Sequence, residues 1–226
     1  MKRILSYFTK TEIAIWAFSV FFILLAFIIF DKSNYLTLIA SLIGVTSLIF
    51  NAKGNPFGQL LMVIFSIFYG YISYTFCYYG EMITYLGMTA PMALFALISW
   101  LKNPYNGNKA EVKIESLNKK DCILMLILAT IVTAIFYFIL KAFNTANIVP
   151  STISVTTSFV AVYLTFKRIP LFALAYACND IVLIILWALA TAQNFSYLSV
   201  VICFIAFLVN DLYGYFNWLK IKKRQA

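Results

Sequence analysis

The chain of 226 residues contains no histidine, and charged residues make up only 11% of it. The absence of histidine removes the commonest metal ligand and the usual proton-relay side chain. The four cysteines (Cys77, Cys122, Cys178 and Cys203) have no C-x-x-C spacing, so we interpret them as small buried hydrophobic residues. The sequence also has no Walker or glycine-rich phosphate loop and no cluster with metal-ligand spacing. We therefore expect no enzyme activity, no cofactor and no metal.

Apolar residues, in contrast, make up 63% of the chain, and the mean hydropathy is +0.91. Soluble domains are nearer half apolar and a quarter charged. The apolar residues form eight stretches, each long enough for a helix to cross the roughly 30 Å hydrocarbon core of a bilayer. These stretches are 12–30, 34–51, 56–78, 82–100, 121–142, 148–166, 170–191 and 195–219. The longest polar segment, 102–120, is too short to form a domain with its own core.

The basic residues are distributed unevenly among the gaps between these stretches. Fifteen of the 17 Lys and Arg residues lie in alternate gaps, and only Lys32 and Lys141 lie in the others. Because Lys and Arg near the ends of spanning helices are retained on the cytoplasmic side, this pattern predicts that both termini are cytoplasmic. An even number of crossings follows, in agreement with eight stretches. The net charge of +9 is thus explained by topology and by anionic lipid headgroups, without nucleic-acid binding.

Three pairs of short matching segments indicate an internal repeat. They are Trp100-Leu101-Lys102 with Trp218-Leu219-Lys220, Asn55-Pro56-Phe57 with Ile169-Pro170-Leu171, and Thr46-Ser47 with Thr157-Ser158. The matches occur in the same order, at offsets of 118, 114 and 111 residues. They predict two three-helix units of the same orientation, with a substrate site between them near the membrane midplane.

The predicted fold is an all-α polytopic membrane protein with eight transmembrane helices. Its expected parts are an extra N-terminal helix (1–33), a first three-helix repeat (34–101), a cytoplasmic loop with a linker helix (102–147), a second three-helix repeat (148–219) and a basic cytoplasmic tail (220–226).

Asn179-Asp180, near the middle of the stretch 170–191, is the strongest candidate for a functional site. An ionisable group inside a membrane span is costly and needs an explanation. Tyr176 and Trp187 share a helix face with Asp180. Carboxylate, amide and aromatic groups together suit a flat, polar ligand that can be cationic. The alternative is that these groups form hydrogen bonds between neighbouring helices and only hold the bundle together.

Weaker candidates lie in the other stretches. For substrate binding they are Thr46, Gln59, Asn210 and Tyr213, and for a gating or structural role they are Pro91, Asp211, Trp100 and Trp218. Pro91 removes a backbone hydrogen bond in mid-helix and is expected to kink the helix. Trp100 and Trp218 suit an aromatic belt at the cytoplasmic interface.

Several segments follow, in order, the pattern of one known family. They are Phe57-Gly58-Gln59, Ile72-Ser73-Tyr74, Gly80-Glu81, Pro91-Met92, the segment from Trp100 to Pro104, and the segment from Asn210 to Tyr215 with Trp218. Over nearly its whole length the chain resembles bacterial nicotinamide riboside transporters of the PnuC type. The resemblance implies a 3+1+3 core like that of the SWEET sugar transporters, preceded by one extra helix.

The same resemblance implies that the protein imports nicotinamide riboside, a NAD precursor, into bacteria by facilitated diffusion, with alternating access at a midplane site. Asn179 matches the ligand-binding amide of the family. One turn later, where some members carry an aromatic ring, this chain has Leu183, so the nearest ring on that face is Trp187. Thiamine or a deoxynucleoside is the alternative substrate, and a membrane scaffold without transport is the alternative of another class. The expected partners are a small molecule and the lipid bilayer of the bacterial cell membrane, with a homo-oligomer left open.

Overall fold

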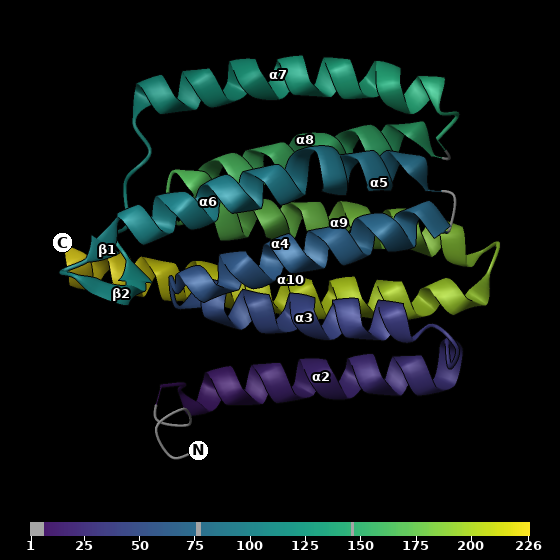
Figure 1. Cartoon of the computed structure of the whole chain (residues 1–226), viewed down its shortest axis with the longest axis horizontal. Helices are drawn as coiled ribbons and strands as arrows, with labels where there is room; N and C mark the ends of the chain where they lie inside the picture. Colours follow the sequence, from purple (N-terminus) through teal and green to yellow (C-terminus); the bar gives the residue numbers. More distant parts are fainter. Residues whose placement is uncertain (1–6, 76–77, 146) are drawn as a thin grey trace.

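The computed structural model describes residues 7–75, 78–145 and 147–226, and their helices run side by side in one bundle (Figure 1). The spans are α2 (Lys10–Phe30), α3 (Tyr35–Ala52), α4 (Pro56–Thr75), the continuous α5 (Tyr79–Thr84), η1 (Tyr85–Thr89) and α6 (Ala90–Lys102), then α7 (Lys119–Ala142), α8 (Ile148–Phe166), α9 (Leu171–Thr191) and α10 (Leu198–Gln225). A short 3-10 turn, η2 (Phe195–Tyr197), precedes α10. In the described part, eight helices are long and apolar enough to cross a membrane, which confirms the predicted number.

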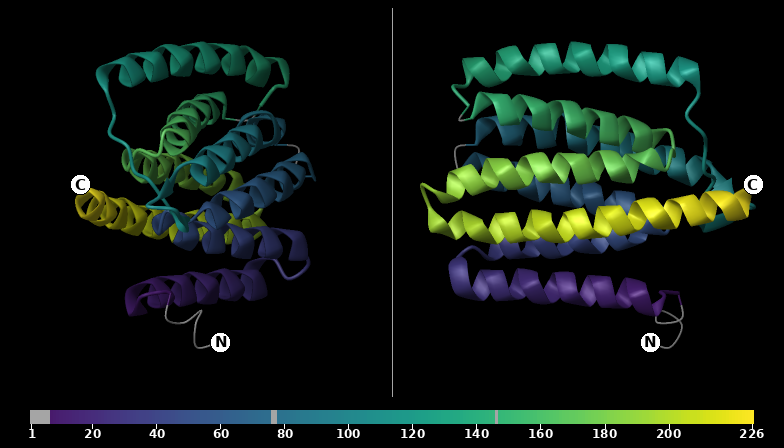
Figure 2. Two further views of the ribbon diagram at one scale, coloured as in Figure 1. Left: turned by 60° about the vertical axis from the view of Figure 1, so that its left-hand side comes forward. Right: turned by 180° about the vertical axis from the view of Figure 1, so that it is seen from behind.

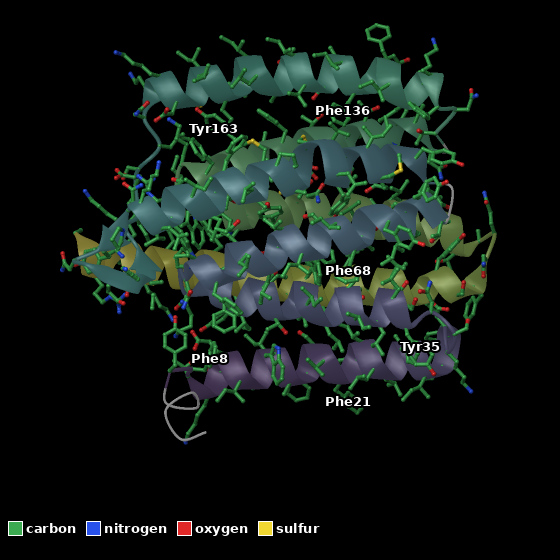
Figure 3. The ribbon with its side chains drawn as sticks, viewed as in Figure 1. Phe8, Phe21, Tyr35, Phe68, Phe136 and Tyr163 are labelled. Atoms are coloured by element: carbon green, nitrogen blue, oxygen red, sulfur yellow. The ribbon has the colours of Figure 1, made fainter. Side chains whose placement is uncertain are left out.

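Two helices lie at opposite edges of the bundle. Figures 1 and 2 show α7 along one edge and α2 along the other, with the remaining spans between them. Helix α2 packs against α10 and α3, whereas α7 packs mainly against α8. Both are the least buried spans, and Figure 3 shows Phe21 on the outer side of α2. Apolar side chains on such a surface require lipid around them.

The inner spans make two matching sets of contacts. Helix α4 packs against α3 and α6, and α9 packs against α8 and α10. Each set also contacts the other, since α6 packs against α8 and α10 packs against α3. Trp100 Nε1 of α6 donates to the Thr165 carbonyl of α8 at 2.9 Å. Trp218 Nε1 of α10 likewise donates to the Asn51 carbonyl of α3 at 2.7 Å.

These two tryptophans correct one interpretation of the sequence. Belt residues face lipid headgroups, but Trp100 and Trp218 are both 0% exposed, and their ring centroids lie 5.4 Å apart inside the bundle. The interpretation as belt residues is therefore wrong. The physical reason is that each indole N–H finds a backbone carbonyl in the interior, so its polar end does not need the interface.

Other differences concern the ends of the predicted elements. The fourth span begins at Tyr79 instead of residue 82, α4 ends at Thr75, and 76–77 lie outside the described residues. The loop after α6 contains a small hairpin, β1 (Pro104–Tyr105) and β2 (Asn108–Val112). Its turn residues Asn106 and Gly107 both have positive φ, which a tight hairpin turn requires.

The expected basic tail is helical, because α10 continues to Gln225. The Gln225 side chain donates to Glu111 Oε1 at 2.8 Å and to the Val112 carbonyl at 3.1 Å, which fastens the end of α10 to the hairpin.

The cysteines are only partly buried as expected. Cys203 is buried, Cys122 is half-buried and Cys178 is exposed on the bundle surface, so the interpretation is wrong for Cys178. Cys77 lies outside the described residues. Among the described residues, no group of three or more Cys, Asp and Glu side chains could hold a metal ion.

Candidate functional site

Two carboxylates meet near the middle of the bundle. Asp180 lies halfway along α9 and Asp211 lies in α10, with exposed fractions of 3% and 5%. Their carboxyl groups are close enough for the charge of one to act on the other. Asp180 Oδ2 has no hydrogen-bond partner among the described residues. Because two carboxylates side by side repel each other, a cationic ligand at the free oxygen would lower the energy of the pair.

Aromatic rings from both sets of helices approach this pair. The ring centroids of Tyr69 in α4 and Tyr85 in η1 lie 4.3 Å apart, and Trp187 of α9 lies 6.2 Å from Tyr69. Tyr85 is close enough to Asp180 to feel its charge. We call Tyr69, Tyr85, Asp180, Trp187 and Asp211 the central cluster. Its rings can stack on a flat ligand, and they attract a cation through their faces.

One aromatic layer closes the bundle at the end opposite the termini. Tyr78 and Tyr197 lie there, and their ring centroids are 4.9 Å and 5.6 Å from that of Trp187. We call Tyr78, Trp187 and Tyr197 the distal layer, because they belong to the start of α5, the last turns of α9 and the 3-10 turn before α10, which lie opposite both chain ends (Figure 1).

A second aromatic layer closes the end that carries the termini. Trp218 lies 5.4 Å from Trp100 and 4.7 Å from Phe172, again between ring centroids. We call these three residues the proximal layer. Trp187 belongs to both the distal layer and the central cluster, whereas Asp180 and Asp211 lie between the two layers, which agrees with their low exposure.

Asn179, although adjacent to Asp180, contacts a different helix. Its Oδ1 atom accepts hydrogen bonds from Thr157 at 2.8 Å and Ser158 at 3.0 Å, both in α8. These bonds hold α9 against α8. Thr157-Ser158 is also one of the matching segments that indicate the internal repeat. In α3 the corresponding Ser47 hydroxyl donates within its own helix, to the Gly44 carbonyl at 2.7 Å.

Gln59 lies in another part of the interior, whereas Tyr176 borders the carboxylates of the central cluster. Gln59 Nε2 donates to Asn51 Oδ1 at 2.9 Å, which joins α4 to α3 near the proximal layer. Gln59 is almost fully buried, but it does not border the central cluster. Tyr176 lies one helical turn before Asp180 and is close enough to Asp180 and Asp211 to interact with both charges.

Three of the predicted site residues contact the N-terminal helix α2 instead. The hydrogen bonds are Trp16 Nε1 to Thr46 Oγ1 at 3.1 Å, Asn210 Nδ2 to Ser19 Oγ at 2.9 Å, and the Tyr213 hydroxyl to Glu12 Oε1 at 3.3 Å. The structure therefore does not bring Thr46, Asn210 and Tyr213 to the central cluster. These three side chains instead form hydrogen bonds that hold α2 against α3 and α10.

Pro91 lies next to a π-helical segment. It occupies the first turn of α6, directly after η1, where the Ala90 N–H bonds to the Tyr85 carbonyl five residues earlier. Pro91 has no N–H, so the regular helical bonding pattern is interrupted in this region. π-Helical turns within α-helices are frequent at functional sites, and this one carries Tyr85.

Tyr69, Tyr85 and Glu81 are not among the site residues that the sequence predicts. The two tyrosines are indistinguishable in sequence from the other aromatic residues of the spans. Glu81 lies just outside the predicted fourth stretch, which begins at residue 82. The structure instead places Glu81 inside α5 with an exposed fraction of 2%. An earlier boundary would have revealed it as an acid within a span.

Comparison with known proteins shows similarity to transporters. The model of a family described as "Nicotinamide mononucleotide transporter" matches residues 34–220. The nicotinamide riboside transporter PnuC of Neisseria mucosa is 28% identical over 217 residues, covering 94% of this chain and 82% of that protein. PnuC of Haemophilus influenzae is 26% identical over 192 residues, covering 84% and 82% respectively.

A crystal structure of the vitamin B3 transporter PnuC is also similar, with a TM-score of 0.84 and 27% identity, over 97% of this chain and 94% of that one. These matches confirm the resemblance that the sequence motifs indicate. The family model begins at residue 34, so α2 lies outside the matched region.

Proposed function

Because the chain belongs to the family described as nicotinamide mononucleotide transporters, we propose that it imports nicotinamide riboside across the bacterial cell membrane by facilitated diffusion. The central cluster carries this proposal. Nicotinamide riboside has a flat, permanently cationic pyridinium ring, and its ribose is neutral. Tyr69, Tyr85 and Trp187 offer ring faces to such a ligand, and Asp180 offers an oxygen without another partner among the described residues.

The charges of the interior favour the riboside over the mononucleotide. A phosphate adds about two negative charges at neutral pH and is usually bound by Arg, Lys or backbone N–H groups. The described Lys and Arg residues lie near the ends of the helices, whereas Glu81, Asp180 and Asp211 are buried between them. These carboxylates would repel a phosphate. The relatives from Neisseria and Haemophilus are likewise named for the riboside.

Transport by alternating access would open the distal and proximal layers in turn. In the distal layer, Trp187 of α9 contacts Tyr78, just before α5, and Tyr197, just before α10. In the proximal layer, the rings come from α6, α9 and α10. The matching contacts of α6 with α8 and of α10 with α3 support two three-helix units that rock against each other. In this mechanism α7 is the linker helix and α2 is the extra helix, as in the predicted 3+1+3 arrangement.

Uptake by purified protein in liposomes tests the proposal. Radiolabelled nicotinamide riboside should equilibrate across the membrane, whereas nicotinamide mononucleotide should stay outside. Initial rates should be equal with and without imposed proton or sodium gradients, because the chain has no histidine to relay protons. Uptake of thiamine or a deoxynucleoside in place of the riboside would support the alternative substrates. Uptake of none of them, at the level of protein-free liposomes, would support a scaffold.

A further inference from the structure

Glu81 is a buried carboxylate that the proposed function does not use. It is the third residue of α5, near the distal layer, and its Oε2 atom has no hydrogen-bond partner among the described residues. The neighbouring Gly80 holds α5 close to α7, because a Cβ atom at this position would lie 2.5 Å from Leu140 Cδ2. The backbone next to Glu81 is thus closely packed against α7.

Glu81 differs from most other acidic residues of the chain because it is in none of the ion pairs among the described residues. Four ion pairs occur among the described residues: Glu12–Lys53, Asp121–Lys167, Glu115–Arg168 and Glu111–Arg224. All four lie at the end of the bundle that carries the termini. None of them includes Glu81, Asp180 or Asp211, which are buried in α5, α9 and α10. A buried carboxylate without a cationic partner is destabilising, so its presence within the spans points to a functional role.

Glu81 and Asp180 border the same aromatic pair. Tyr85 is close enough to both carboxylates to feel either charge, and Tyr69 is close enough to Glu81. The centroids of these two rings lie 4.3 Å apart. Because η1 directly follows α5, Tyr85 lies about one helical turn after Glu81. A flat cation that moved between the carboxylates would therefore pass over ring faces.

We propose that Glu81 is a specificity-determining residue, which selects flat organic cations between the distal layer and the central cluster. This inference rests on the proposed function. A single buried carboxylate would hold a cation tightly and release it slowly. Two carboxylates separated by aromatic rings provide successive sites of moderate strength, and conduction requires such sites. A neutral nucleoside gains nothing from Glu81, so the residue would discriminate by charge.

The test is Glu81→Gln in proteoliposomes, with two labelled ligands: nicotinamide riboside and its reduced, uncharged analogue. Removing the charge should lower the initial uptake of the riboside about tenfold, the effect of one incompletely screened charge, and should change uptake of the reduced analogue little. The melting temperature should stay near that of the wild type. Glu81→Asp, which keeps the charge, should retain most of the preference for the cation. Glu115→Gln is the matched control, because Glu115 is half-exposed and forms an ion pair with Arg168. This change should affect the uptake of neither ligand.

Three results would overturn the role of Glu81. Equal losses for both ligands with a lower melting temperature would show a structural residue. An unchanged ratio of the two uptake rates would show that Glu81 does not sense charge. Stimulation of wild-type uptake by a proton gradient, abolished in Glu81→Gln, would show a proton carrier instead. A wild-type protein that moves no nicotinamide riboside would refute the proposed function itself, and this outcome is distinct from the other three.

Discussion

At the scale of single residues, each Asn-Asp pair divides its contacts between two helices. In α9, Asn179 bonds to α8, whereas Asp180 meets Asp211. In α10, Asn210 bonds to Ser19 of α2, whereas Asp211 faces α9. Adjacent side chains on a helix point about 100° apart, so two neighbours can serve different partners. In both pairs the amide attaches the helix to its neighbour and the carboxylate points into the bundle.

This division predicts different effects for the two residues of α9. Asp180→Asn should weaken binding of nicotinamide riboside about tenfold or more, because it removes a charge in a region of low dielectric, and it should affect the reduced analogue less. Affinities of the purified mutant for the two ligands, measured by calorimetry, check this expectation.

Asn179→Ala is the matched control. It removes the acceptor of two hydroxyl groups and should lower stability by about 1–3 kcal/mol, with similar binding losses for both ligands. If Asp180→Asn instead lost both ligands equally, the electrostatic role of Asp180 would be refuted.

At the scale of elements, one carboxylate of α2 makes several of the polar contacts that attach this helix to the core. Glu12 is 1% exposed and caps its own helix, where it accepts from the Thr9 N–H at 2.7 Å. The same side chain accepts from Lys53 Nζ at 3.1 Å and from the Tyr213 hydroxyl at 3.3 Å. It thus connects α2 to the α3–α4 loop and to α10.

Glu12→Gln should therefore destabilise the protein by about 3–5 kcal/mol, the usual cost of removing one partner from a buried ion pair. The measurement is the rate of thermal inactivation in detergent. Asp121→Asn, which breaks the more exposed pair with Lys167, serves as the control and should change this rate little. Equal rates for both mutants would mean that α2 is not held by Glu12.

The π-helical segment η1 gives a second prediction at this scale. In Pro91→Ala the restored N–H can bond the Gly87 carbonyl, which favours regular α-helix and would turn Tyr85 away from Tyr69. Affinity for nicotinamide riboside should fall about threefold to tenfold, the value of one aromatic contact. Pro150→Ala, in the first turn of α8, where proline is tolerated, should leave the affinity unchanged. Unaltered binding in Pro91→Ala would show that Pro91 does not maintain the site.

At the scale of the whole molecule, the two ends of the bundle differ in charge. The end with the termini carries the hairpin and all four ion pairs of the described residues, whereas Lys32 and Lys141 lie at the opposite end. Accessibility reporters placed after Arg224 and at Asn106, in the hairpin turn, should both report the cytoplasm, and one at Asn144 should report the exterior. Disagreement between the first two sites would refute the predicted topology.

The number of spans, their approximate ends and the family could all be predicted from the sequence, because each depends on local properties. The length of an apolar stretch decides whether a helix can cross the bilayer, and charge at its ends decides the orientation. Asp180 was also found this way, since a carboxylate in mid-span is conspicuous in any apolar sequence. The predicted start of the fourth stretch at residue 82 hid Glu81, because a boundary error of three residues is enough to leave an acid outside a predicted span.

Only the tertiary structure decided which face of each helix meets which neighbour. Thr46, Asn210 and Tyr213 face α2, and Trp100 and Trp218 are buried in the proximal layer, although their sequence context suited other roles. Tyr69 and Tyr85 join the central cluster only because η1 brings α5 and α6 against α4. The physical reason is that lipid is as apolar as the core, so hydropathy marks a span but does not distinguish its lipid-facing side from its inner side.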